Sequence, residues 1–508
     1  MHDRELFQLI FPSYGDYKLP VYIWMTSLSV KLIGVSEIAA RMPSALIGIL
    51  QIVLVFQLVK VVFSESEKNK RTLRRKAAMI AMTLAITPWS ITFSRTGFEG
   101  HTGQFFLTLG VYFLFKSKQR KAFLLLASAA AVVSVYSYFS VRYVWPIVYV
   151  SFFLCSIDLA IFKKKNIQTM TKTAILPLLW CTIPFILWGL CLLPMIRSPL
   201  YAESERFRLD TDSILKNHDE IVESNRYRSL SGNTVESRII YHRWWLTLRE
   251  LMKNYSDHLD FRYLFLTGDP NSRHGTGAVG IFSITLFPFL FFGIKKMWEN
   301  DKRSLAFLII WWLAALLPAS VPTDTPHALR SINALSPLVL IVGYGVSEFF
   351  LRANTHHNKI LLILKCVCLG LITLHTLHFI HDYFSHYPSR SAYEWQDGYK
   401  QTVEVVMARY PDVSKVWMNQ SDTRLYLWFM IYGGFTPDQI QTAQYDTFYL
   451  KKMGKISTQG FPWGTQHGDG EKIIVISDPG RQEWDGNWNQ LIRNAEGVVI
   501  FEVAEYLE

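Results

Sequence analysis

The sequence predicts an all-α polytopic membrane protein with a small α/β domain at its C-terminal end. Half of the 508 residues are hydrophobic and only 18% are charged. The apolar residues gather in runs near the length that crosses a hydrocarbon core of about 30 Å. These runs lie at 44–63, 77–94, 102–115, 122–139, 143–162, 173–195, 277–294, 304–321, 331–350 and 360–380. A soluble protein does not bury so many, so we expect a transmembrane bundle of about ten spans over 44–380.

Lysine and arginine in the short loops orient these spans. Alternate loops are basic, at 64–76, 116–121, 163–172, 295–303 and 351–359. Basic short loops stay in the cytoplasm. The intervening loops, including the long loop 196–276, and the tail 381–508 are therefore expected outside. The net charge of +11 belongs to the cytoplasmic loops, and it indicates no nucleic-acid partner.

Residues 1–43 are expected to be part of an exported loop. The stretch VYIWMTSLSVKLIGV (21–35) is apolar and aromatic but shorter than a span, which predicts a helix lying among the membrane lipids at the interface. A chain that starts outside the membrane has no evident route there, since these residues contain neither a signal peptide nor a spanning helix. We therefore expect one further helix to precede residue 1.

The tail and the cysteines complete the organisation. GYKQTVEVVMARYPD (398–412) has helical spacing, and KVWMNQ (415–420), KIIVISD (472–478) and GVVIFEV (497–503) have the character of strands. This pattern predicts an extracytoplasmic α/β domain over 381–508.

All five cysteines, at 155, 181, 191, 366 and 368, fall inside predicted spans. We expect them to be packing residues and not a disulfide framework.

Chemically useful side chains gather at the outer ends of the predicted spans. Carboxylates and ionisable groups placed there are usually functional, and arginine matches phosphate oxygens with two parallel hydrogen bonds. The groups are Asp16 and Lys18; Arg95, Glu99 and His101; Tyr138 and Arg142; Asp269, Arg273 and His274; and Asp324, His327 and Arg330.

Each group has an ordinary explanation when it is taken singly. Asp16 and Lys18 suit a solvated turn, Arg95 suits an anchor that reaches the interface, and a lone histidine is more often a helix-end residue than a ligand. Together they favour transfer of a group from a membrane-anchored phosphate. No HExxH or CxxC spacing is present, so we expect no metal and no cofactor, although carboxylates alone could hold a divalent cation.

Two segments carry a family resemblance. YGDYKLPVYIWMTSLSVKLIGVSEIAARMPSALIG (14–48) and FSRTGFEGHTGQFFLTLGVYF (93–113) together resemble membrane glycosyltransferases of the GT-C type, in particular protein O-mannosyltransferases and lipid A aminoarabinose transferases. YLFLTGDPNSRHGTG (263–277), PHALRSINALSP (326–337) and SAYEWQDGYKQTV (391–403) resemble later landmarks of a bacterial branch.

The resemblance implies a GT-C-like bundle and a hexosyltransferase. Such an enzyme would move a sugar from a polyprenyl-phosphate-linked donor to a protein, lipid or glycan at the outer face of the cytoplasmic membrane, with inversion of the anomeric carbon. Glu99 matches an exported acidic residue of the family, and Lys18 matches a lysine near the donor phosphate. Further donor-phosphate ligands implied are Arg95, Arg142, Arg330 and His327. The remaining candidate site residues are His101, Tyr138, Asp269, Arg273 and His274.

One departure from the family pattern matters for activity. Members carry an acidic residue, often a pair, early in the first exported loop, after a first spanning helix, and this sequence shows neither. Asp16 is the candidate substitute. We therefore expect the chain as given to be impaired or inactive in transfer. Two alternatives stay open: a non-catalytic homologue that binds glycan or a partner, and a transporter or flippase, for which charges at mid-membrane or matching interrupted helices would be expected.

Overall fold

The computed structural model describes residues 8–13, 16–156, 167–215, 219–352, 359–419, 424–446, 449–458, 471–480 and 488–507. Several parts of the predictions lie outside the described residues. They include residues 1–7 and 14–15 of the first exported loop, residues 157–162 of the span 143–162, residues 216–218 of the long loop, residues 163–166 and 353–358 of two basic loops, residue 420 of a predicted strand, and the side chain of Cys181.

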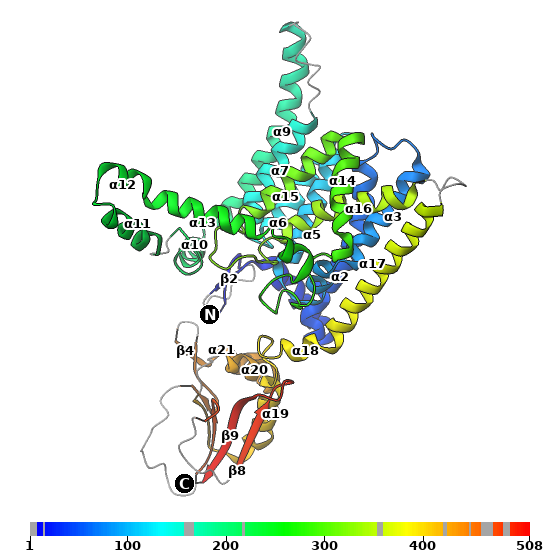
Figure 1. The fold of residues 1–508 in the computed structure, drawn as a ribbon. Coiled ribbons are helices and arrows are strands. Elements are labelled where there is room, and N and C mark those ends of the chain that lie inside the picture. The colour runs from blue at the N-terminus through cyan, green and yellow to red at the C-terminus, as the bar shows by residue number, and fades with distance from the viewer. Residues whose placement is uncertain are drawn as a thin grey trace. The chain divides into compact units, whose positions relative to one another are not determined.

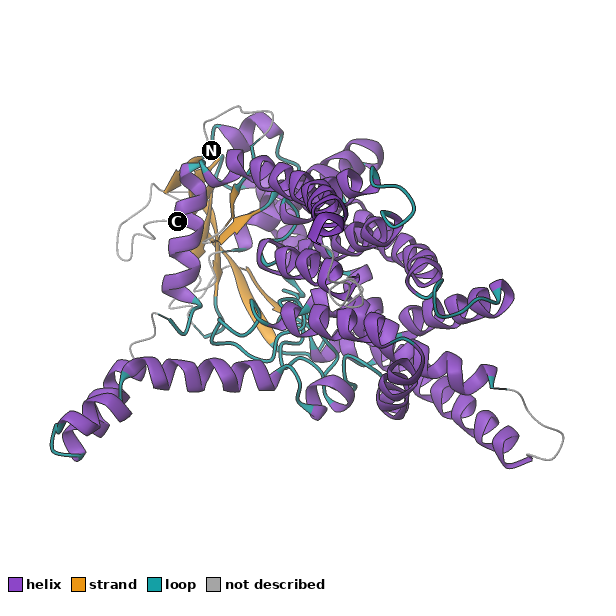
Figure 2. Ribbon diagram, turned by 90° about the horizontal axis from the view of Figure 1, so that it is seen from above, coloured by secondary structure: helices purple, strands orange, loops and turns teal. Residues whose placement is uncertain are grey.

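The chain divides into two compact units. The larger contains Gln8–Phe11 and Tyr17–Ile380, and it is helical (Figure 1). The smaller is built mainly from His381–Glu508 and also includes Pro12–Asp16. The long strands of the chain, drawn as orange arrows in Figure 2, belong to this smaller unit.

Two three-residue strands, β1 (Phe11–Ser13) and β2 (Asp16–Lys18), stand at the start of the described chain. Each strand has residues in both units. The helices of the larger unit follow in chain order. They are α1 (Pro20–Ile33), α2 (Glu37–Val62), α3 (Lys70–Ile86), α4 (Pro88–Arg95), α5 (Glu99–Lys116), α6 (Phe123–Val135), α7 (Val141–Ser156), α9 (Ile167–Ile196), α10 (Pro199–Thr211), α11 (Asp219–Leu230), α12 (Val235–Ile240), α13 (Arg243–Asp257), η1 (Arg262–Leu266), η2 (Ile284–Leu286), α14 (Phe287–Asn300), α15 (Lys302–Leu316), η3 (Ile332–Ala334), α16 (Leu335–Leu351) and α17 (Lys359–Ser385).

Three helical segments among the described residues are long and apolar enough to cross a membrane: α2, η3 with α16 (Ile332–Leu351), and α17. The number rises to five if each of two bent pairs is one span. These pairs are α3 with α4, bent by 62°, and Thr182–Ile196 with α10, bent by 87°. The chain is therefore a membrane protein, and the predicted count of ten spans is not confirmed.

Two predicted spans are wrong in part. The span 277–294 has no helix before Ile284, because Gly277 adopts a positive φ of 72° and a Cβ at Gly280 would clash with the backbone of Phe265. This stretch is a tightly packed loop. The span 304–321 ends as a helix at Leu316, two residues ahead of Pro318, which has no backbone N–H with which to continue the helix.

The helix predicted over 21–35 is confirmed as α1. It begins with Pro20 at its first position, where the missing N–H of proline costs no hydrogen bond. It ends at Gly34, whose φ of 81° favours glycine. Leu28, Leu32 and Ile33 are exposed on this helix. An exposed apolar surface of this kind suits the interfacial position that the sequence predicts.

A buried polar cluster joins three helices of the bundle. The Ser336 hydroxyl on α16 accepts hydrogen bonds from the side-chain amides of Gln104 on α5, at 2.7 Å, and Gln51 on α2, at 3.1 Å. The Thr108 hydroxyl lies 2.8 Å from the same oxygen, and all four side chains are fully buried. Polar side chains hold helices together where lipid supplies no hydrophobic drive, so this cluster fixes how α2, α5 and α16 pack.

The smaller unit contains α18 (Tyr387–Arg390), α19 (Tyr399–Arg409), η4 (Tyr410–Asp412), α20 (Leu425–Tyr432) and α21 (Pro437–Gln441). Its strands are β3 (Lys415–Asn419), β4 (Gln444–Asp446), β5 (Tyr449–Met453), β6 (Ile456–Ser457), β7 (Lys472–Ser477), β8 (Trp488–Arg493) and β9 (Val499–Leu507). The sheet has the order β4-β5-β6-β3-β7-β9-β8. Strand β3 pairs in parallel with β6 and β7, and the other pairs are antiparallel.

The strands predicted in the tail are confirmed as β3, β7 and β9, and the helix as α19. These strands occupy the middle of the sheet, where burial on both faces produces continuous apolar runs in the sequence. The sequence missed β4, β5, β6 and β8, because these strands are short or half exposed. Cys155, Cys191, Cys366 and Cys368 are free. Cys155 and Cys368 are half-buried, whereas Cys191 and Cys366 are exposed, so the predicted packing role is wrong for these two.

Glu348→Ala should destabilise the protein strongly. Lys76 is buried, and its ammonium lies 2.5 Å from Glu348 and 3.1 Å from Glu67. Removing one partner of a buried pair costs about 3–5 kcal/mol, because the other charge stays buried. We expect the lower end of that range, since Glu67 remains. The free energy of unfolding in detergent measures the effect.

Glu65→Ala is the matched control. It removes an ion pair of 3.0 Å with Lys118 in which both side chains are exposed. An exposed pair contributes at most about 1 kcal/mol. Equal losses of unfolding free energy in the two variants would show that the burial of Lys76 does not strengthen its ion pair.

Candidate functional site

Glu99 and Lys18 lie in contact, although 81 residues separate them. Glu99 is the first residue of α5, where the helix dipole favours a negative charge. Lys18 ends β2, and its ammonium donates a hydrogen bond to Glu99 Oε1 at 3.2 Å. The exposed fraction is 38% for the Lys18 side chain and 20% for that of Glu99. Both side chains are therefore partly exposed.

Tyr138 packs directly on the first turns of α5. A Cβ at Gly103 would lie 2.6 Å from Tyr138 Cβ, and one at Gly100 would lie 3.5 Å from its ring carbon Cζ. Glycines three residues apart share one helix face. The GFEGHTG segment therefore presents a smooth surface beside Glu99, and the tyrosine of the α6–α7 turn occupies it. The hydroxyl of Tyr138 donates to the carbonyl of Leu329 at 3.3 Å.

Charged groups from several segments surround Tyr138. Its side chain interacts electrostatically with Glu99, Arg330, Arg208 and Lys18. These residues come from α5, the loop after α15, α10 and β2. Among the described residues, Glu99 and these three cations therefore lie near one tyrosine, and Arg330 is itself paired with Asp212.

Helix α10 supplies functional groups that the sequence reasoning missed. The guanidinium of Arg208 donates to the Tyr17 carbonyl at 3.0 Å and lies 3.7 Å above the Phe139 ring. Glu203 accepts a hydrogen bond from the Tyr17 hydroxyl at 3.2 Å. The sequence predicts 196–276 only as one undivided loop. Ser198 followed by Pro199, two residues after an apolar run, is the signal that a new helix begins there.

Arg142 is held by the same helix. Its guanidinium lies 2.6 Å from Glu205 and donates to the Tyr201 hydroxyl at 2.8 Å. Only 11% of the Arg142 side chain is exposed. A phosphate would have to displace Glu205, so the geometry favours a role for Arg142 in fixing α10.

The guanidinium of Arg330 is more accessible to a ligand than that of Arg142. Its guanidinium lies 3.6 Å from Asp212 at the end of α10 and donates to the Asp324 carbonyl at 3.2 Å. Its side chain is 23% exposed. Arg95 is exposed at the last position of α4. Asp16 begins β2 but is assigned to the smaller unit, so it is not placed relative to Glu99.

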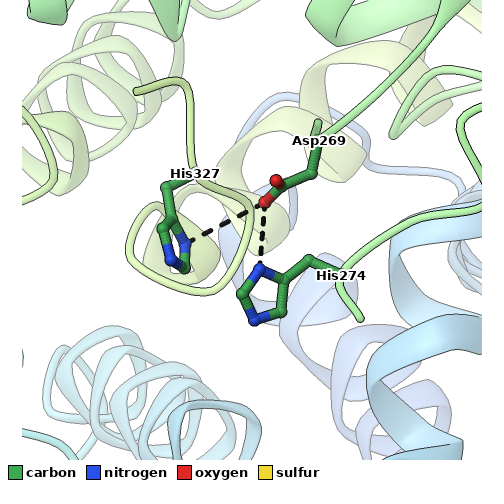
Figure 3. Close-up of side chains that lie close together, drawn as sticks. All are labelled: Asp269, His274 and His327. Carbon is green, nitrogen blue, oxygen red and sulfur yellow. Dashed lines mark ion pairs between the residues drawn. The ribbon is translucent and has the colours of Figure 1, made fainter. Parts of the chain in front are cut away.

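Asp269, His274 and His327 form a second, buried cluster (Figure 3). Asp269 Oδ2 lies 3.3 Å from His274 Nδ1 and 3.9 Å from His327 Nδ1. The same oxygen accepts the Ala328 N–H at 2.6 Å, and Oδ1 accepts that of Asn271 at 2.8 Å. One carboxylate therefore ties the loop after η1 to the loop after α15.

The histidines of this region differ in their surroundings. Burial, and then the charge of Arg330, lowers the pKa of His327, so this ring is neutral. His258, which the sequence reasoning missed, accepts the backbone N–H of His327 at 3.1 Å.

The two remaining candidate residues are His101 and Arg273. His101 is fully buried on α5, with Nδ1 3.2 Å from the Ser44 hydroxyl, and packing within the bundle accounts for its position. Arg273 is half-buried in the loop that carries His274.

Gly103→Ala should disturb the candidate site and lower stability. The new Cβ would lie 2.6 Å from Tyr138 Cβ, and overpacking of this kind costs about 1–3 kcal/mol. Gly370→Ala on α17 is the control, because no atom of the described residues lies within 4 Å of its Cβ position. Thermal unfolding of the two variants in the same detergent measures the difference. A Gly103 variant as stable as the Gly370 variant would contradict the packing described here.

Residues 17–188 match the family profile of the dolichyl-phosphate-mannose-protein mannosyltransferases. The matched segment is about a third of the chain. A comparison with curated proteins finds no match.

Two similar solved structures are ArnT from Cupriavidus metallidurans in the apo state and the same protein bound to undecaprenyl phosphate. The first has 10% identity and a TM-score of 0.48, over 96% of this chain and 87% of that one. The second has 11% identity and a TM-score of 0.47, over 97% and 88%. The Archaeoglobus fulgidus oligosaccharyltransferase tethered to an acceptor peptide has 12% identity and a TM-score of 0.48, over 84% and 56%.

The matched segment 17–188 contains Lys18, Glu99 and Tyr138 and ends before α10. Over this segment, the resemblance to membrane mannosyltransferases predicted from the sequence is confirmed.

Proposed function

We propose that this protein is a glycosyltransferase of the membrane surface. It moves a hexose from a polyprenyl-phosphate-linked donor to a protein, lipid or glycan acceptor at the outer face of the cytoplasmic membrane. The smaller unit lies on that same side of the membrane. The family match over residues 17–188 supports the reaction class, and the arrangement around Tyr138 supports the assignment of roles.

The observation that carries the proposal is the contact between Lys18 and Glu99 beside two arginines. A carboxylate at a helix N-terminus is an acceptor for a proton. Lys18, Arg208 and Arg330 surround the same tyrosine as Glu99. Cations in this position suit the lipid phosphate, because arginine and lysine both stabilise phosphate oxygens.

The proposed reaction is a single displacement. The acceptor hydroxyl attacks the anomeric carbon of the donor sugar while Glu99 takes the hydroxyl proton. The bond between that carbon and the phosphate oxygen breaks, and the oxygen leaves with the electron pair. Lys18 and the arginines stabilise the charge that develops on this oxygen. Attack opposite to the leaving group inverts the anomeric carbon.

The Lys18–Glu99 pair also suggests how the donor prepares the site. Without donor, the lysine neutralises the carboxylate that must act as base. The donor phosphate is a diester with one negative charge spread over two free oxygens, and it would compete with Glu99 for the lysine ammonium. Donor binding would then free Glu99 to accept a proton, so that the base is released only when the leaving group is in place.

Glu99→Gln should abolish most of the transfer. A positioned general base contributes about 10²–10⁴-fold, and the amide cannot accept the proton. The measurement is transfer of labelled sugar from a polyprenyl-phosphate donor in membrane vesicles, with expression checked by immunoblot. Glu250→Gln is the control, because it alters an exposed pair of 2.7 Å with Lys253 on α13. Transfer by Glu99→Gln equal to that by the unaltered chain would contradict the proposal.

Lys18→Met should weaken binding of the lipid phosphate, while Lys18→Arg should retain most of it. The charge, and not the lysine itself, attracts the phosphate. Titration of the purified protein with polyprenyl phosphate lacking a sugar measures this directly, and we expect a loss of about tenfold for methionine, which corresponds to about 1.4 kcal/mol. Lys31→Met, in the last turn of α1, controls for the loss of a positive charge. Equal weakening by both methionine variants would show that only net charge matters.

A further inference from the structure

A second chemical site lies among Asp269, His274 and His327. The three side chains come from two loops, one after η1 and one after α15, and Figure 3 shows them converging on the carboxylate of Asp269. Each offers one ligand atom, and these atoms lie within 4.8 Å of one another. The exposed fractions of the side chains are 1% for Asp269, 4% for His274 and 8% for His327.

We propose that this cluster binds one divalent transition-metal ion of the zinc class. Two imidazole nitrogens and one carboxylate oxygen suit zinc and its neighbours better than magnesium or calcium, which prefer oxygen ligands. Bonds of about 2.0 Å in a tetrahedron place neighbouring ligand atoms about 3.3 Å apart. The distances of 3.3 Å and 3.9 Å from Asp269 Oδ2 are close to this spacing.

An unsatisfied nitrogen supports the assignment independently. His274 Nδ1 is buried and has no hydrogen-bond partner among the described residues, although it faces Asp269 Oδ2. A buried polar atom without a partner normally costs about 1–3 kcal/mol. Coordination of a cation would use this lone pair and remove the penalty.

The surrounding groups hold two of the ligands in place. The backbone N–H groups of Ala328 and Asn271 orient the Asp269 carboxylate. His258 accepts the N–H of His327 and so fixes the backbone of the third ligand. Outer contacts of this kind orient metal ligands. A cavity of about 10 Å³ lies beside His274 and is also lined by Thr276, with room for about one water molecule.

Two interactions oppose the ion, and the proposal must overcome them. His327 Nδ1 also lies 3.3 Å from the Arg330 N–H, which a metal bound there would displace. Arg330 and Arg273 place positive charge near His327. The single carboxylate compensates only part of this charge, so we expect an affinity lower than that of sites with several anionic ligands.

The direct test is the metal content of the purified full-length protein. The protein is prepared without a polyhistidine tag, stripped with a chelator, incubated with zinc sulfate and desalted. We expect about one zinc per chain by elemental analysis. His274→Ala and Asp269→Asn should each lose most of it. His378→Ala, an exposed histidine on α17, should retain it. Zinc retained equally by all three variants, or absent from the unaltered protein, would overturn the proposal.

A second measurement needs no variant and therefore does not depend on whether the variants fold. Cobalt added to the stripped, unaltered protein should give the intense visible absorption of a four-coordinate ion. Zinc should also raise the unfolding temperature by several degrees, since a ligand of the folded state stabilises it, whereas magnesium at the same concentration should not. A weak octahedral cobalt spectrum, or an equal shift with magnesium, would contradict the site. Neither readout depends on glycosyl transfer.

Discussion

The cost of placing charge in hydrocarbon determines where the chemistry of this protein lies. An ionised side chain at the centre of a bilayer is expensive, and neutral polar groups are cheaper to place there. The side-chain amides of Gln51 and Gln104 both donate to Ser336 between α2, α5 and α16. Charged groups that act together must instead meet at the ends of helices. The bundle provides fixed ends, and the loops determine which charges converge there.

Small residues convert the fixed helix ends into a site. Gly100 and Gly103 let Tyr138 lie against the start of α5, which places a short turn directly beside Glu99. The 87° bend between Thr182–Ile196 and α10 returns the chain toward β2 and the α6–α7 turn. Contacts of α10 with Tyr17 and Arg142 then hold it there. Backbone geometry at a few positions therefore brings together the charged groups of the site.

The sequence predicted those features that depend on local patterns. Apolar runs located α2, α16 and α17, and the buried strands β3, β7 and β9 were recognised because burial on both faces leaves continuous apolar segments. Glu99 and Lys18 were selected as chemically useful, but no local pattern states that they touch. Their contact depends on how β2 meets α5. The path of α10 and the meeting of Asp269 with His327 are equally non-local, and histidine and aspartate on separate loops form no motif in the sequence.

The two proposed sites share one short segment, and this has a physical consequence. His327 and Arg330 are joined through the Arg330 N–H, which lies 3.3 Å from the ring of His327. Arg330 in turn belongs to the cations around Tyr138. An ion at Asp269 would fix the ring of His327 and compete for that N–H, so it would alter the backbone that carries Arg330. A bound metal would therefore act on sugar transfer through the position of this arginine, and need not touch the reacting atoms.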